Sequence, residues 1–167
     1  AEGHRDTGSE YVRETYIESD LELMFPPTYI PNDSERISLY RELDNMEEER
    51  DILAFTERLK DRFGKIPKEG KELIRIVRLR RMAKKLGMEK VVLKKGQMSL
   101  FLVNNPDSPY YQSEAFGKLL GFIQKHPREC NLREQNGKRS IVIKNVPTVE
   151  AACGCLQEME KINSTDF

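Results

Sequence analysis

The chain has 167 residues, 38% of them hydrophobic and 34% charged, and its formal net charge is +0. These values are typical of one highly charged globular domain, and the balanced charge excludes an overall attraction to nucleic acid or anionic lipid. No apolar run approaches the roughly 18–20 residues of a membrane span, and no signal-peptide core follows the N-terminus. Cys130 stands alone, and Cys153 and Cys155 point apart on a predicted helix, so a disulfide scaffold is not expected. We therefore expect a soluble protein of the reducing cytoplasm.

The first half of the chain predicts a linker, a strand and three helices. Residues 1–15 show no periodicity and are expected to be a flexible linker or a tag-derived remnant, which leaves a single domain over 16–167. Alternating apolar residues predict a strand over 16–25. Three amphipathic helices should follow: from caps at 32–34 to Leu43, from a capping-box-like pair of Asn45 and Glu48 to Phe63 before Gly64, and from Pro67 to Leu86 before Gly87.

After Gly87 the hydrophobic period changes from that of a helix to that of strands. The predicted elements are a hairpin over 91–103 that turns at 96–97, a helix over 113–125, a second hairpin with strands 130–134 and 140–144, and a helix over 148–162. Asn136-Gly137 is the strongest hairpin signal in the chain. Hairpins in place of regular strand–helix alternation predict an α+β fold with a largely antiparallel sheet.

The residue types that carry catalysis do not form a recognisable site. His4 and His126 lack partners at metal-binding spacing, and His126 is expected to be a cation at a helix C-terminus. Cys153 and Cys155 are expected to be helix-borne thiols, mostly buried, and the isolated Gly-Lys pairs lack the other residues of a phosphate-binding loop. We therefore expect no catalytic residue, no metal and no cofactor in this chain, and we do not expect it to be an enzyme.

The predicted helix 68–86 is the best candidate for contact with nucleic acid. Lys71, Arg75, Arg78 and Lys85 fall within one arc at 100° per residue. No aromatic residue interleaves this basic face, so stacking on bases is not supported. The alternative is that these cations form salt links within the molecule or contact a protein partner.

The helix that ends at Phe63 carries the acidic counterpart. Glu57 and Asp61 are four residues apart and share a helix surface, with Arg58 and Arg62 beside them. An exposed pair of carboxylates there could receive arginines from a partner. The alternative is that Asp61 only pairs with Arg58 or Lys65, while Glu57 faces water.

Three segments carry a family resemblance: TYIPNDSERISLYREL, ERLKDRFGKIP and RLRRMAKKLGMEKV. In order and spacing they resemble the C-terminal domain of the bacterial transcription-repair coupling factor. The resemblance covers about residues 16–161 and is specific over 29–89. It implies that the full protein is an ATP-driven translocase on double-stranded DNA, of the helicase superfamily, which displaces stalled RNA polymerase and recruits the excision-repair protein UvrA. ATP and magnesium would belong to the motor upstream of this domain.

The same resemblance implies a regulatory role. In that family the C-terminal domain packs against a UvrB-like module of the same protein and masks its UvrA-binding surface. Acidic residues on the helix ending in DRFG make part of that contact, and Asp61 matches one of them. At the position of the preceding glutamate this chain has Arg58, and Glu57 lies one residue away, about 100° around the helix.

The leading hypothesis is therefore a non-catalytic, autoinhibitory interaction domain that uses Glu57, Arg58, Asp61 and Arg62. Its partners would be the UvrB-like module directly, UvrA and RNA polymerase indirectly, and DNA through the motor. The rival hypothesis is an accessory nucleic-acid-binding domain that uses the four cations of helix 68–86. It predicts salt-sensitive DNA binding by the isolated chain.

Overall fold

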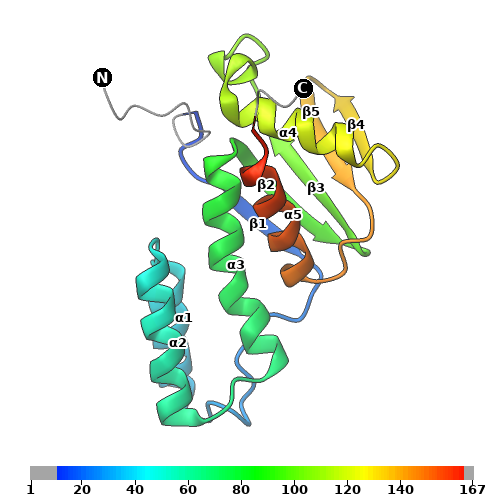
Figure 1. The fold of residues 1–167 in the computed structure, drawn as a ribbon. Helices are drawn as coiled ribbons and strands as arrows, with labels where there is room; N and C mark the ends of the chain where they lie inside the picture. The colour runs from blue at the N-terminus through cyan, green and yellow to red at the C-terminus, as the bar shows by residue number, and fades with distance from the viewer. Residues whose placement is uncertain (1–10, 164–167) are drawn as a thin grey trace, which may run out of the picture. The chain divides into compact units, whose positions relative to one another are not determined.

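The computed structural model describes residues 11–163 and divides the chain into two compact units. Of the described residues, unit 1 comprises 11–20 and 79–163, and unit 2 comprises 21–78. The elements are β1 (Tyr16–Ser19), α1 (Asp33–Asp44), α2 (Glu49–Phe63), α3 (Lys68–Lys85), β2 (Met88–Lys94), β3 (Gln97–Leu102), the 3-10 helix η2 (Pro109–Gln112), α4 (Glu114–Lys125), β4 (Cys130–Gln135), β5 (Lys138–Ile143) and α5 (Val149–Lys161) (Figure 1). The predicted α+β class is confirmed.

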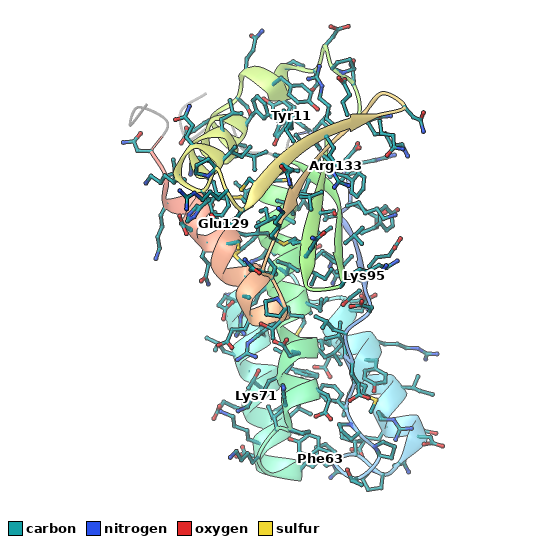
Figure 2. The ribbon with its side chains drawn as sticks, turned by 90° about the vertical axis from the view of Figure 1, so that its right-hand side faces the viewer. Tyr11, Phe63, Lys71, Lys95, Glu129 and Arg133 are labelled. Atoms are coloured by element: carbon teal, nitrogen blue, oxygen red, sulfur yellow. The ribbon has the colours of Figure 1, made fainter. Side chains whose placement is uncertain are left out.

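Unit 1 is built on a five-stranded sheet of order β1-β2-β3-β5-β4, in which only the β1–β2 pair is parallel. Alternate residues of the central strands are buried on one face: Val91, Leu93, Met98, Leu100, Leu102, Ile141 and Ile143. Helices α4 and α5 cover this face (Figures 1 and 2). Each buried Leu or Ile side chain stabilises the fold by about 1.5–3 kcal/mol, so the alternation fixes which face of each strand turns inward.

The end of α3 is closed by a tyrosine from η2. Gly87 follows the helix with φ +80°, and a Cβ atom there would lie 2.2 Å from the Tyr110 ring. The Tyr110 hydroxyl donates to the Leu86 carbonyl at 2.7 Å, and the side chain is fully buried. Burial raises the pKa of Tyr110 far above its ordinary value, so the hydroxyl stays a donor. Only glycine allows this close approach of ring and backbone.

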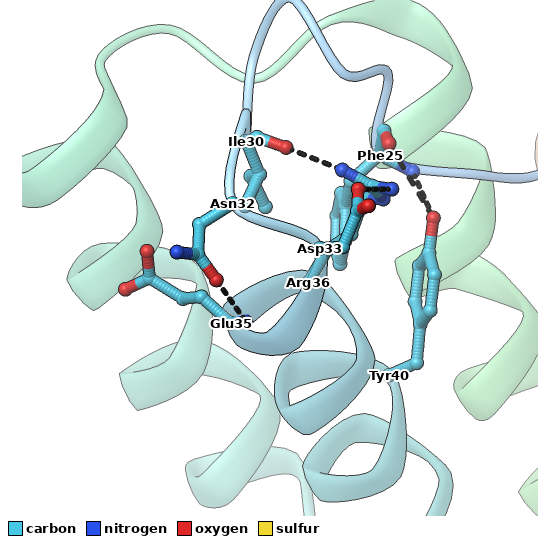
Figure 3. Close-up of polar contacts among 7 residues, drawn as sticks. All are labelled: Phe25, Ile30, Asn32, Asp33, Glu35, Arg36 and Tyr40. Carbon is cyan, nitrogen blue, oxygen red and sulfur yellow. Dashed lines mark hydrogen bonds and ion pairs between the residues drawn. The ribbon is translucent and has the colours of Figure 1, made fainter.

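Unit 2 consists of α1, α2 and the first part of α3, residues 68–78, preceded by an irregular segment that anchors the core. Phe25 is fully buried and stacks on Tyr40 with 5.5 Å between ring centroids. The Tyr40 hydroxyl accepts from the Phe25 amide at 3.0 Å (Figure 3). These contacts explain why the aromatic and proline-rich segment before α1 is ordered: its rings are the centre of the unit.

Most helix ends fall where the sequence predicts them. Asn32 caps α1 by accepting from the Glu35 amide at 2.8 Å (Figure 3), and Gly64, with φ +87°, ends α2. The capping-box prediction for α2 is wrong. Asn45 instead closes α1 by donating from its side chain to the Arg41 carbonyl at 3.0 Å, and Glu48 precedes α2 with no side-chain cap bond.

Three further predictions differ from the structure. The strand predicted over 16–25 ends at Ser19, which pairs with Leu93. The Asp20 amide still donates to the Leu93 carbonyl at 3.0 Å, and β2 ends at Lys94, before its own turn. That turn is at Lys95-Gly96, one residue earlier than predicted, with φ +55° and +73°. The η2 helix was not predicted.

The last residues of the predicted linker are part of the folded structure. Val12 and Thr15 are buried, and the Thr15 hydroxyl donates to the Met88 carbonyl at 2.7 Å, so residues 11–15 belong to unit 1. The prediction for residues 1–10, which includes His4, lies outside the described residues. The prediction that residues 16–167 form one domain stays a prediction, since the structure resolves two compact units in that range.

Candidate protein-interaction surface

Helix α2 has a buried face and an exposed face that differ in chemistry. Ile52, Phe55 and Leu59 point into the unit 2 core and are at most 2% exposed. On the opposite side, five exposed residues form the outer face of α2: Arg50, Leu53, Ala54, Glu57 and Asp61. This division follows from the 3.6-residue period, because residues at i and i+4 lie on the same side.

The two arginines predicted to take part in the interaction surface are instead used within unit 2. Arg58 pairs with Glu42 of α1, and its guanidinium lies 5.6 Å from the centre of the Phe55 ring. Arg62 makes two bonds to Glu35 of α1, Nε to Oε2 at 2.7 Å and Nη2 to Oε1 at 3.1 Å. The Glu35 carboxylate raises the pKa of Arg62 above its ordinary value through these bonds. Both arginines thus join α1 to α2.

The two predicted carboxylates remain available. Glu57 makes only a long pair with Lys60 on the same helix, at 3.4 Å, and both side chains are more than half exposed. Among residues 11–163, no cation pairs with Asp61. The alternative in which Arg58 or Lys65 neutralises Asp61 is therefore not what the structure contains. Glu57 and Asp61 share the outer face with Leu53, which is 53% exposed and which the sequence analysis did not single out.

The basic residues of α3 are not equivalent. Arg78 makes a two-pronged contact with Glu49 of α2, with distances of 2.8 Å from Nη2 and 3.0 Å from Nε. Arg75 donates to Glu72 at 3.0 Å, and the Glu72 side chain is only 9% exposed. Lys71 and Lys85 are exposed; Lys71 belongs to unit 2 and Lys85 to unit 1. The four predicted cations therefore do not form one free basic stripe.

The polar groups of unit 1 are arranged as structural contacts. His126 caps the end of α4, and its Nε2 lies 2.5 Å from a carboxylate oxygen of Glu158 on α5. The three cysteines are free: Cys130 and Cys153 are buried, and Cys155 is half-buried. Burial raises the pKa of the Cys130 thiol to about 11, with smaller contributions from Cys155, Glu129 and Glu158. A neutral, buried thiol is a poor nucleophile.

The part of the chain that the structure describes contains neither a metal-binding cluster nor a membrane-spanning helix. Within 11–163 there is no group of three or more His, Cys, Asp or Glu side chains placed to hold a metal ion. No helix in this range has the length and apolar character needed to cross a bilayer.

Comparison with known proteins identifies one family. The family model described as the TRCF domain matches residues 19–113. The transcription-repair-coupling factor of Escherichia coli (strain K12) is 30% identical over 121 residues, which are 72% of this chain and 10% of that protein. That of Rickettsia prowazekii (strain Madrid E) is 26% identical over 135 residues, 79% of this chain and 11% of that protein. The chain thus spans about a tenth of the length of these relatives.

A solved structure shares the fold. The crystal structure of the C-terminal domain of transcription-repair coupling factor superposes with a TM-score of 0.71. The alignment covers 92% of this chain and 96% of that one, at 15% sequence identity.

Proposed function

This chain belongs to the TRCF domain family, as the C-terminal domain of a transcription-repair coupling factor, and we propose that it is the autoinhibitory protein-interaction domain of that larger protein. The larger protein works in DNA repair coupled to transcription. We propose that its ATP- and magnesium-dependent motor lies outside this chain and moves along DNA, removes stalled RNA polymerase and recruits UvrA. This domain supplies no catalytic group. It controls access to the UvrA-binding surface.

The observation that supports this role is the separation of charges on α2. Arg58 and Arg62 are bound to carboxylates of α1, so they cannot neutralise the carboxylates on the outer face. Glu57 and Asp61 are four residues apart on that face and are exposed. A pair of carboxylates spaced by one turn accepts guanidinium groups in charge-assisted hydrogen bonds. The adjacent Leu53 adds an apolar contact that excludes water from such bonds.

The partner is the UvrB-like module of the same protein. When the outer face of α2 binds basic residues of that module, the surface that recruits UvrA is covered. The contact forms in one state of the protein and breaks in the other, so it shifts a two-state equilibrium. A coupling free energy of about 1–3 kcal/mol would repress UvrA binding roughly 5–150-fold.

The test uses the full-length protein with Glu57→Lys and Asp61→Lys together. Charge reversal should repel the partner's cations and raise the affinity for UvrA at least about 5-fold, measured by surface plasmon resonance. The matched control is Asp51→Lys with Asp107→Lys, which changes the net charge equally. Asp51 is an exposed carboxylate on α2 outside the outer face, and Asp107 is exposed in unit 1. Unchanged UvrA affinity in the first variant, or an equal gain in the control, would contradict the proposal.

A further inference from the structure

The loop before α3 and the first turns of that helix form a hollow of about 390 Å³ lined largely by cations. Its lining residues are Lys65, Ile66, Pro67, Lys68, Lys71 and Arg75, here called the basic hollow. All six belong to unit 2, and none is a carboxylate. Figure 2 labels Lys71, on α3 near the end of the unit where Phe63 closes α2.

The cations of the basic hollow differ in how they are held. Arg75 is fixed by its 3.0 Å bond to the nearly buried Glu72. Lys65, Lys68 and Lys71 are exposed, and no carboxylate of residues 11–163 pairs with any of them. Elsewhere in unit 2, four of the five exposed cations have a carboxylate partner, Arg50, Arg58, Lys60 and Arg62; the fifth, Arg41, has none among residues 11–163. The three lysines are therefore a local excess of positive charge in a unit whose other cations are largely balanced.

The lysines of the basic hollow suit a series of phosphates as the ligand groups. The planar arginine fork gives bidentate recognition of carboxylates and of phosphates, because it binds two oxygens at once. The one arginine in the basic hollow is already occupied by Glu72. Lysine ammonium groups act as mobile point charges, which suits successive phosphates that each accept from one direction. Lys68 and Lys71, and Lys71 and Arg75, are three and four residues apart, so they follow one side of α3.

The lining also indicates which nucleic acid would fit. Binding of single strands uses aromatic rings on which unpaired bases stack. The basic hollow has an aliphatic floor of Ile66 and Pro67 and no aromatic residue. It can therefore contact a phosphate backbone but cannot hold unpaired bases.

We propose that the basic hollow binds the phosphate backbone of double-stranded DNA without sequence preference. This contact is distinct from the outer face of α2 and does not depend on the proposed autoinhibition. It also changes the membership of the predicted basic surface. Lys71 and Arg75 remain in it, Lys65 and Lys68 join it, and Arg78 is excluded because Glu49 holds it. Lys85 is excluded as a residue of unit 1.

The test measures binding of the 167-residue chain to a fluorescent duplex of about 20 base pairs by anisotropy at several salt concentrations. Three to four phosphate contacts should give a slope of log K against log salt of about −2.7 to −3.6. The triple variant K65Q/K68Q/K71Q should bind at least about 10-fold more weakly at low salt. Its slope should be shallower than that of the parent, by about 2.7 in magnitude. All three side chains are exposed, so we expect its circular dichroism and melting temperature to match the parent.

The control variant K85Q/K95Q/K125Q removes three exposed lysines of unit 1. It should bind within about 2-fold of the parent, since it leaves every contact of the basic hollow in place. An equal loss in the control would show that overall charge, rather than the basic hollow, drives binding. Two further ligands complete the test: a single strand of the same length and an acidic peptide such as deca-glutamate. Absence of duplex binding at low salt, or tighter binding of either of these ligands, would overturn the proposal.

Discussion

The two units use charged side chains in different ways. In unit 1, ion pairs connect neighbouring strands as well as helices: Glu18 on β1 reaches Lys90 at 2.8 Å and Lys94 at 3.0 Å, both on β2, and His126 at the end of α4 contacts Glu158 of α5. In unit 2, ion pairs connect separate helices, as Arg62 does with Glu35 and Arg78 with Glu49. The pairs between strands of unit 1 hold the register of an edge strand. The ion pairs of unit 2 involve most of its arginines and leave other charged side chains exposed to solvent. Both proposed contacts, the outer face of α2 and the basic hollow, use such exposed side chains.

The largest expected difference between the units is in the loss of stability when a glycine at a helix end is replaced. Gly87 and Gly64 both have positive φ, but only at Gly87 would a Cβ atom meet another group, the Tyr110 ring. We expect Gly87→Ala to lower the free energy of unfolding by about 3–4 kcal/mol, from strain plus overpacking, and Gly64→Ala by about 1–2 kcal/mol, from strain alone. Urea unfolding followed by circular dichroism measures both. Equal losses would mean that the Tyr110 contact does not constrain Gly87.

Replacing arginines of unit 2 tests which helix-linking pairs matter for stability. Arg78→Met leaves the Glu49 carboxylate without its two-pronged partner, and the Arg78 side chain is only 27% exposed. We expect a loss of about 1–2 kcal/mol. Arg58→Met should cost about 0.5 kcal/mol, because that pair is more exposed and methionine retains packing on Phe55. Thermal unfolding of the two variants compares them directly, and a larger loss for Arg58→Met would reverse this ranking.

A further expected effect concerns the pH dependence of unit 1. The folded chain raises the pKa of Cys130 from 9.0 to about 11, so unfolded chains lose this proton first as the pH rises. The stabilisation is complete below pH 9, and it is lost as the pH rises through about 11. The free energy of unfolding should therefore fall by on the order of 1 kcal/mol more in the parent than in Cys130→Ala across this range. Urea titrations at the two ends of the range measure the difference, and parallel pH profiles would show that the thiol does not contribute.

Local signals in the sequence predicted most of the helices and both hairpins. Asn32 and Gly64 mark helix ends by properties of single residues, and Asn136-Gly137 marks a turn in the same way. Strand length was less predictable, because β1 ends near the turn that ends β2, and pairing between strands is a property of the sheet. The alternation through 16–25 instead leads to Phe25, which is buried in the core of unit 2.

The sequence predicted the sign of the charges on each candidate surface, but it did not predict which of these charges form ion pairs. The helical period placed Glu57 and Asp61 on one face, as the structure has them. It could not predict that Arg62 binds a residue 27 positions away or that Arg78 binds one 29 positions away. These distant pairs separate charges that hold unit 2 together from charges left for partners. Sequence spacing alone reports on neighbours within one helix, so it could not join Lys65, which precedes α3, to Lys71. Lys68 lies on the predicted helix three residues before Lys71, and the spacing could have included it.

The most direct measurement is calorimetric titration of this chain with the UvrB-like module of the same protein, each purified separately. The account predicts saturable binding that weakens with salt, is reduced at least about 10-fold by Glu57→Lys with Asp61→Lys, and is unchanged by K65Q/K68Q/K71Q. Absence of binding, or equal binding by the charge-reversed chain, would contradict the claim that the outer face of α2 is an inhibitory contact.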